Sequence, residues 1–495
     1  MTTEIQLPAA ELKEALAGFN KIIGKTTLPV FWHVRLTKHE NGPVHLQAAN
    51  LDEFATFTFP NESSSAPIDL LIPFDQLLKV GKSCGKKENV FIRQKSDAAF
   101  IAYPLCSQIV EQSITKMDLT EWPRVPSIAN DEPVIVGETF KSALKAALDC
   151  SSQDGSRQVL QTAFLDVSDR NAHYIVGADG RQLFAANSFA FDLKDSLMVP
   201  HRPFLIWKGF MEDGDWKLSI KGPAKEDDVG WINIQSNRWN LITKQIDGKY
   251  PNWKQVIPKA DTKEATVLLN NEAVELLMNV VPKLPGDDDV NQPVRVVITD
   301  DKELILQAEG KNGESPVTIR VPGANVQGNP VTILVNRNYL LKALKWGLFE
   351  LELYPTEMPI LIFKSEGTRL VVAGLRDDNA PQTTQSPQPK TNPPIQASSP
   401  ETKEQPKEES PSMKTVNRIE QVQTTQPTIQ PEQPTPAFKQ ATEQVEKIKE
   451  TLKGVVSDLN DLLKTLAQAQ KEKRTTEKEI EAIRESLQSL QRIKI

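Results

Sequence analysis

A short phrase that recurs at nearly even spacing limits the fold of this chain more than any other feature of its sequence. Residues 70–79 read LLIPFDQLLK, residues 333–342 read ILVNRNYLLK and residues 197–208 read LMVPHRPFLIWK. Looser copies read IQLPAAELKEAL, VIVGETFKSALKAAL and VLLNNEAVELLM, so that Pro, Gly or Asn breaks the phrase at positions 8, 73, 137, 200, 270 and 336. The intervals of 65, 64, 63, 70 and 66 residues indicate six similar repeat units.

Each copy of the phrase predicts a strand followed by a helix. The apolar triplet is typical of a strand, and the break that follows it suits a helix start, because Asn caps helices and Pro fits their first turn. After the helix come alternating runs with turn residues, such as HVRLTKHENGPVHLQAANLDEFATFTF at 33–59 with its Asn41-Gly42 turn. Residues 162–187 and 294–310 have the same pattern. Each unit is therefore predicted to be a strand, a helix and an antiparallel meander.

A second marker groups the units in pairs. Trp122-Pro123 and Tyr250-Pro251 lie 128 residues apart, about two units, and an aromatic-Pro step forces an extended backbone that can close one pair before the next begins. One helix cannot cover a sheet alone, so each unit is half of a domain. The prediction is an α+β fold with three tandem domains at 1–129, 130–262 and 263–376.

Composition places the chain in a broad class. Hydrophobic residues make up 39% of the chain, and the net charge of −7 does not indicate a nucleic-acid binder, so any basic surface must be local. The three cysteines are an odd number without a CxxC pair, which favours a reducing cytosol. The N-terminus lacks the features of a secretory signal, and no long apolar run predicts a membrane span. We expect a soluble protein of the cytoplasm.

The C-terminal quarter has a different composition. Residues 377–436 are rich in Pro, Gln, Thr and Ser and contain no Gly or aromatic residue, which predicts a disordered linker. Residues 437–495 predict a coiled coil, either one long helix or a helical hairpin that bends at 471–478. Its seam could mediate self-association or bind an unknown partner. The apolar seam alternates steps of three and four along Val445, Ile448, Leu452, Val455, Leu459, Leu462, Leu466 and Ala469.

Three segments carry a resemblance to a known family. They read IIGKTTLPVFWHVRL at 22–36, GADGRQLFAA at 177–186 and IDGKYPNWKQVIP at 246–258. With the three tandem domains, they resemble the bacterial sliding clamp, the beta subunit of DNA polymerase III, over residues 1–376. The resemblance implies a homodimer that closes head to tail into a ring around duplex DNA, with the sheets outside and one helix of each unit lining the hole.

The resemblance implies that basic residues on these helices face the DNA. Such contacts neutralise phosphates without reading bases, so binding would be independent of sequence. The fifth helix departs from the pattern, because Glu272 and Glu275 lie on it and Lys283 comes only at its end. The candidates are Lys13, Lys21, Lys25, Lys79, Lys82, Lys141, Lys145, Arg202, Lys208, Arg337, Lys342 and Lys345.

The resemblance also implies a pocket that binds short peptide motifs of DNA polymerase and the clamp loader. Apolar walls with a few polar groups suit a short motif with hydrophobic anchors. The chain has Ala373 and Gly374 where the family has Met and Pro, and Arg181-Gln182 where it has His-Arg, which predicts a smaller, looser pocket with altered or lost binding. The candidates are Leu160, Asp179, Gly180, Leu183, Pro251, Val256, Asn336, Tyr339, Pro359, Val371 and Val372.

Motifs that would indicate an enzyme are weak. GKSCG at 81–85 matches a hydrolase nucleophile elbow, but it falls at the end of a predicted helix instead of a strand-to-helix turn. The five histidines lack metal-binding spacing, and GKTT at 24–27 lacks the upstream Gly of a phosphate-binding loop. We predict no catalysis, no cofactor and no metal. Two hypotheses stay open: a DNA-encircling processivity clamp, and a clamp-fold scaffold paralogue that acts through its coiled coil.

Overall fold

The computed structural model of the chain describes its first three quarters, all within one compact part at residues 1–386. The described residues are 2–24, 28–40, 42–62, 66–95, 98–106, 108–128, 132–223, 229–286, 291–309 and 316–376. The linker predicted at 377–436, the coiled coil predicted at 437–495 and the candidate Lys25 lie outside the described residues. None of the described helices has the length and apolar character needed to cross a bilayer.

Five of the six repeated phrases start a helix at the residue after the break, as predicted. The N-cap positions are occupied by Pro8, Pro73, Gly137, Asn270 and Asn336. The two asparagine side chains accept hydrogen bonds from backbone N–H groups of their helices, whereas the two prolines make no side-chain cap. The helices are α1 (Ala9–Phe19), α2 (Phe74–Ser83), α3 (Glu138–Asp149), α4 (Lys208–Met211), α5 (Asn271–Val280) and α6 (Arg337–Lys345).

The fourth helix prediction is wrong, because no helix follows Pro200 directly and α4 has only four residues. Pro203 disfavours a helical backbone at the residue before it. Phe204 and Leu205 are then fully buried in the core, and Trp207 is the N-cap of the short helix. The residues predicted to form the first turns of this helix are therefore buried in the core without being helical.

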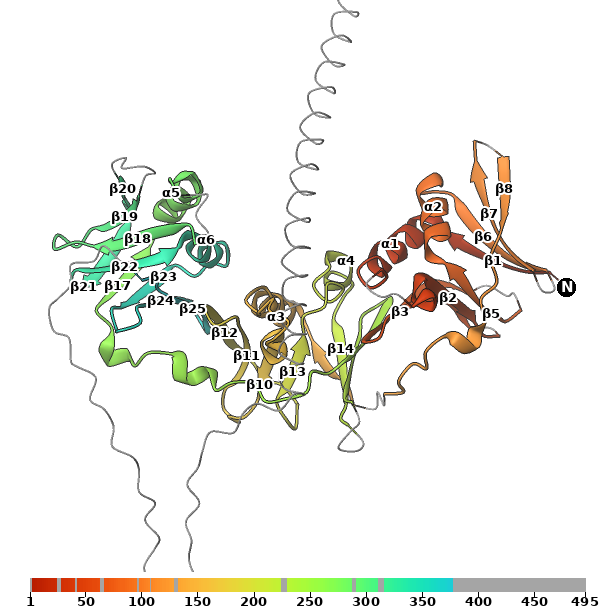
Figure 1. Cartoon of the computed structure of the whole chain (residues 1–495), viewed down its shortest axis with the longest axis horizontal. Coiled ribbons are helices and arrows are strands. Elements are labelled where there is room, and N and C mark those ends of the chain that lie inside the picture. Colours follow the sequence, from red (N-terminus) through yellow and green to blue (C-terminus); the bar gives the residue numbers. More distant parts are fainter. Residues whose placement is uncertain are drawn as a thin grey trace, which may run out of the picture. The chain divides into compact units, whose positions relative to one another are not determined.

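The meanders follow the predicted order along the chain (Figure 1). Short 3₁₀ turns lie between them: η1 (Pro29–Trp32), η2 (Leu119–Glu121), η3 (Gln158–Leu160), η4 (Trp253–Val256), η5 (Ala260–Thr262) and η6 (Val281–Lys283). The strands of the first four units are β1 (Thr2–Pro8), β2 (His33–Lys38), β3 (Pro43–Ala49), β4 (Glu53–Glu62), β5 (Ile68–Pro73), β6 (Asn89–Lys95), β7 (Ala98–Leu105), β8 (Gln108–Ser113), β9 (Val134–Val136), β10 (Thr162–Asp166), β11 (His173–Ala178), β12 (Gln182–Phe189), β13 (Leu197–Pro200), β14 (Trp216–Lys221), β15 (Trp231–Gln235) and β16 (Trp239–Lys244). Those of the last two are β17 (Ala265–Leu269), β18 (Pro293–Ile298), β19 (Leu304–Ala308), β20 (Val317–Arg320), β21 (Ala324–Gly328), β22 (Val331–Asn336), β23 (Glu350–Tyr354), β24 (Ile360–Ser365) and β25 (Thr368–Ala373).

Neighbouring units exchange their first strands. The first strand of unit one, β1, pairs with β6 of unit two, while β5 of unit two pairs with β2 of unit one. The same exchange joins β9 to β14 and β13 to β10, and again β17 to β23 and β22 to β18. Each unit therefore completes the sheet of its partner, which explains why the pair and not the single unit is the structural element.

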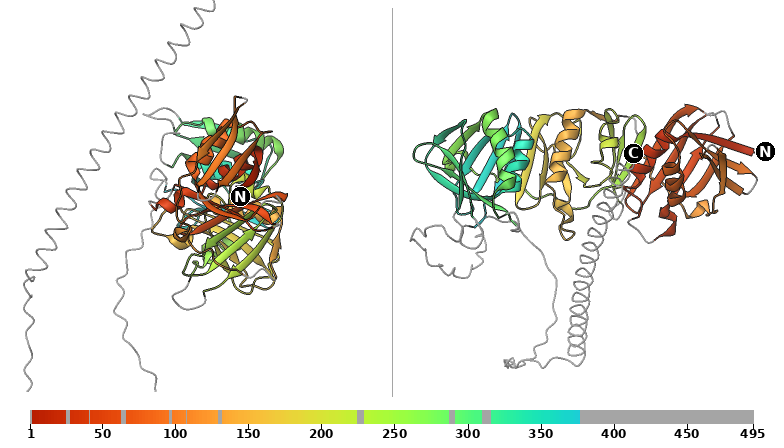
Figure 2. Two further views of the ribbon diagram at one scale, coloured as in Figure 1. Left: turned by 90° about the vertical axis from the view of Figure 1, so that its right-hand side faces the viewer. Right: turned by 90° about the horizontal axis from the view of Figure 1, so that it is seen from above.

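Sheets also continue from one pair of units to the next. Strand β4 pairs with β16, and β12 pairs with β25, which produces an eight-stranded and a nine-stranded sheet. Four-stranded sheets at the two ends have the orders β1-β6-β7-β8 and β20-β19-β18-β22. The domain limits predicted near residues 129 and 262 stay a prediction. Figure 2 (right) shows the helices of all three pairs on one side of the sheets.

Each predicted aromatic-Pro step packs on one of these shared sheets. Trp122 belongs to an apolar cluster with Phe54 of β4 and Ile242 of β16, and its Nε1 donates to Gln47 Oε1 at 3.0 Å. Tyr250 and Trp253 belong to the equivalent cluster over β12 and β25. The segments of Trp122 and Tyr250 thus cover the two joins, which are the strand pairs β4–β16 and β12–β25 between neighbouring pairs of units. They lie on the face opposite the main core.

Close packing of helix on sheet depends on one glycine in particular. A Cβ atom on Gly177 of β11 would lie 1.8 Å from the carbonyl oxygen of Ala147 on α3. No rotamer change can relieve a clash with backbone, so any side chain here must separate the helix from the sheet.

We therefore predict that Gly177→Ala lowers the free energy of unfolding by about 3 kcal/mol. Urea unfolding followed by circular dichroism measures this change. Gly155→Ala is the control, since its Cβ would meet no atom within 4 Å. Equal unfolding midpoints for the two variants would contradict the packing described.

Candidate peptide pocket and basic helix faces

An apolar pocket of about 260 Å³ opens where β12 pairs with β25. The register sets Leu183 opposite Val371, and both side chains belong to the apolar cluster of this face. Side chains alternate between faces along a strand, so Val372 points into the main core and is fully buried. The lining residues are Leu160, Ala178, Gly180, Arg181, Gln182, Leu183, Tyr250, Pro251, Asn252, Trp253, Val256, Met358, Ile360, Val371 and Ala373.

A tight turn holds one wall of the pocket. Asp179 Oδ1 accepts hydrogen bonds from the backbone N–H groups of Arg181 and Gln182 at 2.7 and 2.9 Å, and Oδ2 accepts from Gln182 Nε2 at 2.9 Å. Gly180 has φ +93°, a left-handed conformation that favours glycine. Asp179 therefore positions the turn and does not itself line the pocket.

Two aromatic residues of the Tyr250-Pro251 run form the opposite wall. Tyr250 stacks on Phe164 with ring centroids 4.7 Å apart. Trp253 Nε1 donates to Asp166 Oδ2 at 2.9 Å. Burial raises the pKa of the Tyr250 phenol well above its ordinary value, so the wall stays uncharged. These fixed rings make the pocket a preformed apolar site.

The structure brings together six of the eleven residues predicted for this pocket: Leu160, Gly180, Leu183, Pro251, Val256 and Val371. Asp179, Asn336, Tyr339, Pro359 and Val372 do not line it. Asn336 caps α6, and Tyr339 on the same helix packs against the main core. The sequence reasoning missed Tyr250 and Trp253, although both stand in the DGKYPNW run that pointed to the site.

Ala373 and Gly374, which were predicted to differ from the family pattern, lie at the edge of the pocket. Ala373 lines it, and its backbone N–H donates to the carbonyl of Arg181 at 2.9 Å. Gly374 donates to the carbonyl of Pro359 at 2.6 Å, and a Cβ atom on Gly374 would lie 2.9 Å from Pro359 Cβ. Met358, 74% exposed, supplies a flexible apolar side chain at the opening.

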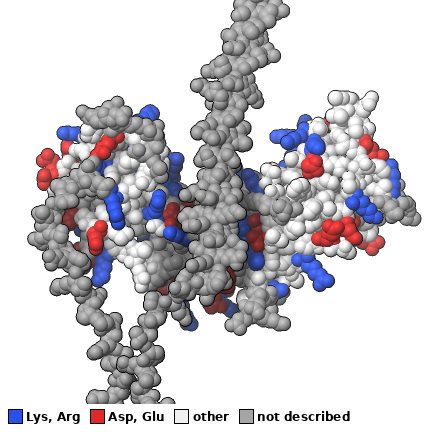
Figure 3. All heavy atoms as spheres, in the orientation of Figure 1, with Lys and Arg blue, Asp and Glu red and all other residues white. Residues whose placement is uncertain are grey.

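Five of the predicted basic residues are exposed: Lys79, Lys82, Lys145, Lys208 and Lys345. Two of these have acidic partners four residues away, since Lys79 lies 3.3 Å from Asp75 and Lys208 lies 3.7 Å from Glu212. Figure 3 shows blue and red side chains interspersed over the visible surface, without one continuous basic band.

The prediction of DNA contact is wrong for Lys141 and Arg337, because both side chains are buried. Lys141 Nζ donates to the carbonyls of Met211 and Gly214 at 2.6 and 3.1 Å. Arg337 Nη1 donates to the carbonyl of Leu284 at 2.6 Å. At these two positions lysine and arginine donate to backbone carbonyls inside the protein instead of facing solvent.

The other predicted basic residues have partners or lie partly buried. Lys13 donates to the carbonyl of Cys84 at 2.6 Å, and Lys21 is half-buried in the turn after α1. Arg202 donates to Thr243 Oγ1 at 3.2 Å. Lys342 on α6 donates to Gln182 Oε1 at 3.0 Å and to the carbonyl of Asp149 at 3.1 Å, which ties α6 to the end of α3.

The motif GKSCG lies at the end of α2, as its place in the repeat predicts. Ser83 donates its hydroxyl hydrogen to the carbonyl of Lys79 at 3.0 Å, a helical contact unlike a nucleophile elbow.

Cys150, which lies at the end of α3 and outside this motif, is also unsuited to act as a nucleophile. Burial raises the pKa of the Cys150 thiol to about 12, which removes its nucleophilic form at neutral pH. Within the described ranges no three His, Cys, Asp or Glu side chains are placed to hold a metal ion.

Comparison with known proteins supports the clamp fold. No family model matches the chain. It is 22% identical to the beta sliding clamp of Synechococcus elongatus over 252 residues, which are 49% of this chain and 64% of that protein, so the match spans less than two thirds of the relative. Solved sliding clamps from Bacillus subtilis and from Bartonella birtlesii, the latter bound to griselimycin, match with TM-scores of 0.65 at 13% and 16% identity. Both matches cover 76% of this chain and 100% of the other, so the predicted likeness to sliding clamps is confirmed and the described part has their fold.

We predict that Lys141→Ala lowers the free energy of unfolding by about 2 kcal/mol, because the carbonyls of Met211 and Gly214 and the carboxylate of Glu138 lose their charged partner. Lys145→Ala, one turn further along the same helix and exposed, is the matched control and should change stability by less than about 0.5 kcal/mol. Thermal unfolding of both variants tests the difference. A stable Lys141→Ala protein would return Lys141 to the candidates for DNA contact.

Proposed function

We propose that this chain, whose described part has the fold of bacterial DNA polymerase III beta subunits, is a DNA sliding clamp. In this proposal it encircles duplex DNA in the cytoplasm, tethers polymerase and other replication or repair proteins through the apolar pocket, and catalyses no reaction. The observation that carries the proposal is the set of three strand-exchanged pairs in continuous sheets, with helices on one side.

Unpaired edges at both ends of the described part support closure into a ring. Strand β8 is one edge of the first four-stranded sheet, and β20 is one edge of the last. Each edge offers backbone N–H and C=O groups to another strand. Ile109 on β8 and Val317 on β20 are 59% and 42% exposed. We propose that β8 of one copy pairs with β20 of a second copy, twice, in a closed homodimer.

Encirclement predicts that the protein stays on nicked circular DNA and leaves when the DNA is linearised. A topological link needs no tight contact, so retention should persist at moderate salt where simple charge attraction fails. Gel filtration of protein with circular and with linear DNA, using a cognate loader or spontaneous opening, measures this. Equal loss from both forms by a folded dimer would instead favour the scaffold alternative.

The scaffold alternative has two observations in its favour. Ala373 lines the pocket where the resemblance predicts Met, and α5 carries Glu272 and Glu275 at exposed positions and no lysine. In that case the chain would keep the fold without loading on DNA and would act through the coiled coil predicted at its C-terminus.

The proposed ring also predicts the effect of a charge at its seam. Ile109→Glu should shift the protein from dimer to monomer, because a carboxylate would be buried without a partner between strands. Sedimentation velocity measures the mass, with Leu51→Glu as the control because Leu51 is 66% exposed in a turn away from both edges. A dimer that survives Ile109→Glu would place the seam elsewhere.

A further inference from the structure

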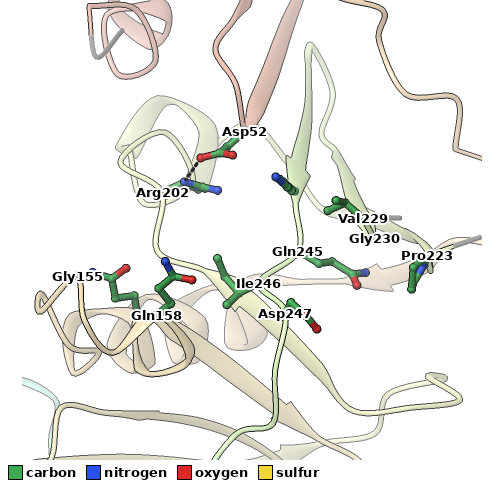
Figure 4. Close-up of a pocket in the computed structure, with 12 residues that line it drawn as sticks. Asp52, Gly155, Gln158, Arg202, Pro223, Val229, Gly230, Gln245, Ile246 and Asp247 are labelled. Carbon is green, nitrogen blue, oxygen red and sulfur yellow. Dashed lines mark ion pairs between the residues drawn. The ribbon is translucent and has the colours of Figure 1, made fainter. Parts of the chain in front are cut away.

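A second cavity, polar and about 760 Å³ in volume (Figure 4), is lined by residues that neighbour those of the apolar pocket along the chain. Two chain segments separate the two. In the first, Gln158 and Gln161 line the polar cavity while Leu160 lines the apolar pocket. In the second, residues 245–247 line the polar cavity and residues 250–253 line the apolar pocket. The two cavities are thus neighbours along both segments.

The two segments form a ridge between the cavities, and they are in direct contact at one point. A Cβ atom on Gly248 would lie 2.9 Å from Val159 Cγ1, so the two segments touch here without a side chain from the second. Gly248 has φ +120°, and its backbone N–H donates to Asp247 Oδ1 at 2.8 Å. Glycine is needed for this backbone, and Val159 packs into the space that a side chain of residue 248 would fill, so the two segments are closely packed here.

The polar cavity presents hydrogen-bonding groups without internal partners. Gln161, Lys244 and Gln245 are half-buried, and among the described residues their side chains make no hydrogen bond or ion pair. Arg202 and Asp52, by contrast, lie 3.6 Å apart as an ion pair at the rim (Figure 4). Half-buried polar groups without partners gain most from a ligand that supplies them.

We propose that the polar cavity extends the peptide pocket, an inference that rests on the proposed function. A partner peptide would fill the apolar pocket with its hydrophobic residues, continue over the ridge between the two segments, and place a polar flank in the cavity. Carboxamides of Gln161 and Gln245 both donate and accept, which matches a peptide backbone, and the Lys244 ammonium donates to a carbonyl or carboxylate. The site therefore selects peptides with an apolar anchor and a polar flank.

The test uses the full-length protein and a displayed library of random 16-residue peptides. Peptides enriched on the wild-type protein but not on Leu183→Asp, which places a charge in the apolar pocket, are synthesised whole and without either flank. We expect removal of one flank to weaken binding about tenfold, equivalent to about 1.4 kcal/mol. In Gln161→Ala/Lys244→Ala/Gln245→Ala, whole and truncated peptides should bind equally, with the affinity of the truncated peptide unchanged.

The controls separate this inference from the proposed function. Gln153→Ala/Lys217→Ala removes exposed polar side chains outside both cavities and should keep the tenfold difference. If truncation has no effect, or the triple variant keeps the difference, the extension is wrong while the apolar pocket stands. If no enriched peptide depends on Leu183, the pocket proposal fails and the extension fails with it.

Discussion

The described structure depends on backbone hydrogen bonds between strands of different units. A unit of about 65 residues has one helix and a meander, and its first strand belongs to the sheet of its partner. Neither unit can bury its apolar face before the other is present, so folding must be cooperative over the pair. The further pairing of β4 with β16 and of β12 with β25 makes each pair part of its neighbour's sheet.

The side chains at the first join show how closely the pairs fit. Trp239 of β16 packs edge-on against Phe19 of α1 with centroids 5.4 Å apart, and a Cβ atom on Gly18 would lie 2.5 Å from the Trp239 ring. Arg238 forms a two-pronged ion pair with Glu14 of α1 at 2.6 and 2.8 Å and also bonds Asp213. Glu14 and Arg238 are 224 residues apart in the sequence. Their ion pair therefore forms only when the first and second pairs of units are packed together.

Short-range sequence patterns predicted the features that depend on neighbouring residues. They failed for the features that depend on tertiary contacts. The breaks at Pro8, Pro73, Gly137, Asn270 and Asn336 located five helix starts, because cap chemistry is set within a few residues. Strand exchange left no local signal. Nor could the recurrence of lysine distinguish exposed Lys145 from Lys141, four residues away on α3, whose burial depends on carbonyls some seventy residues distant.

The same difference between local sequence patterns and tertiary contacts applies to single residues of the apolar pocket. Resemblance of motifs pointed to segments that lie around one apolar cavity, and six residues of the eleven line it. Asp179 holds a turn and Val372 points into the other face, which only the strand register reveals. The polar cavity had no motif, because its residues come from five separate parts of the chain.

The continuous sheets have a mechanical consequence. Each join is an antiparallel ladder of five residue pairs, Glu53–Phe57 against Trp239–Thr243 and Gln182–Ala186 against Thr368–Val372. Shearing such a ladder breaks several hydrogen bonds at once, and the packed segments of Trp122 and Tyr250 resist peeling from outside. Under tension the joins between pairs therefore resist separation, because five backbone pairs must part together at each of them.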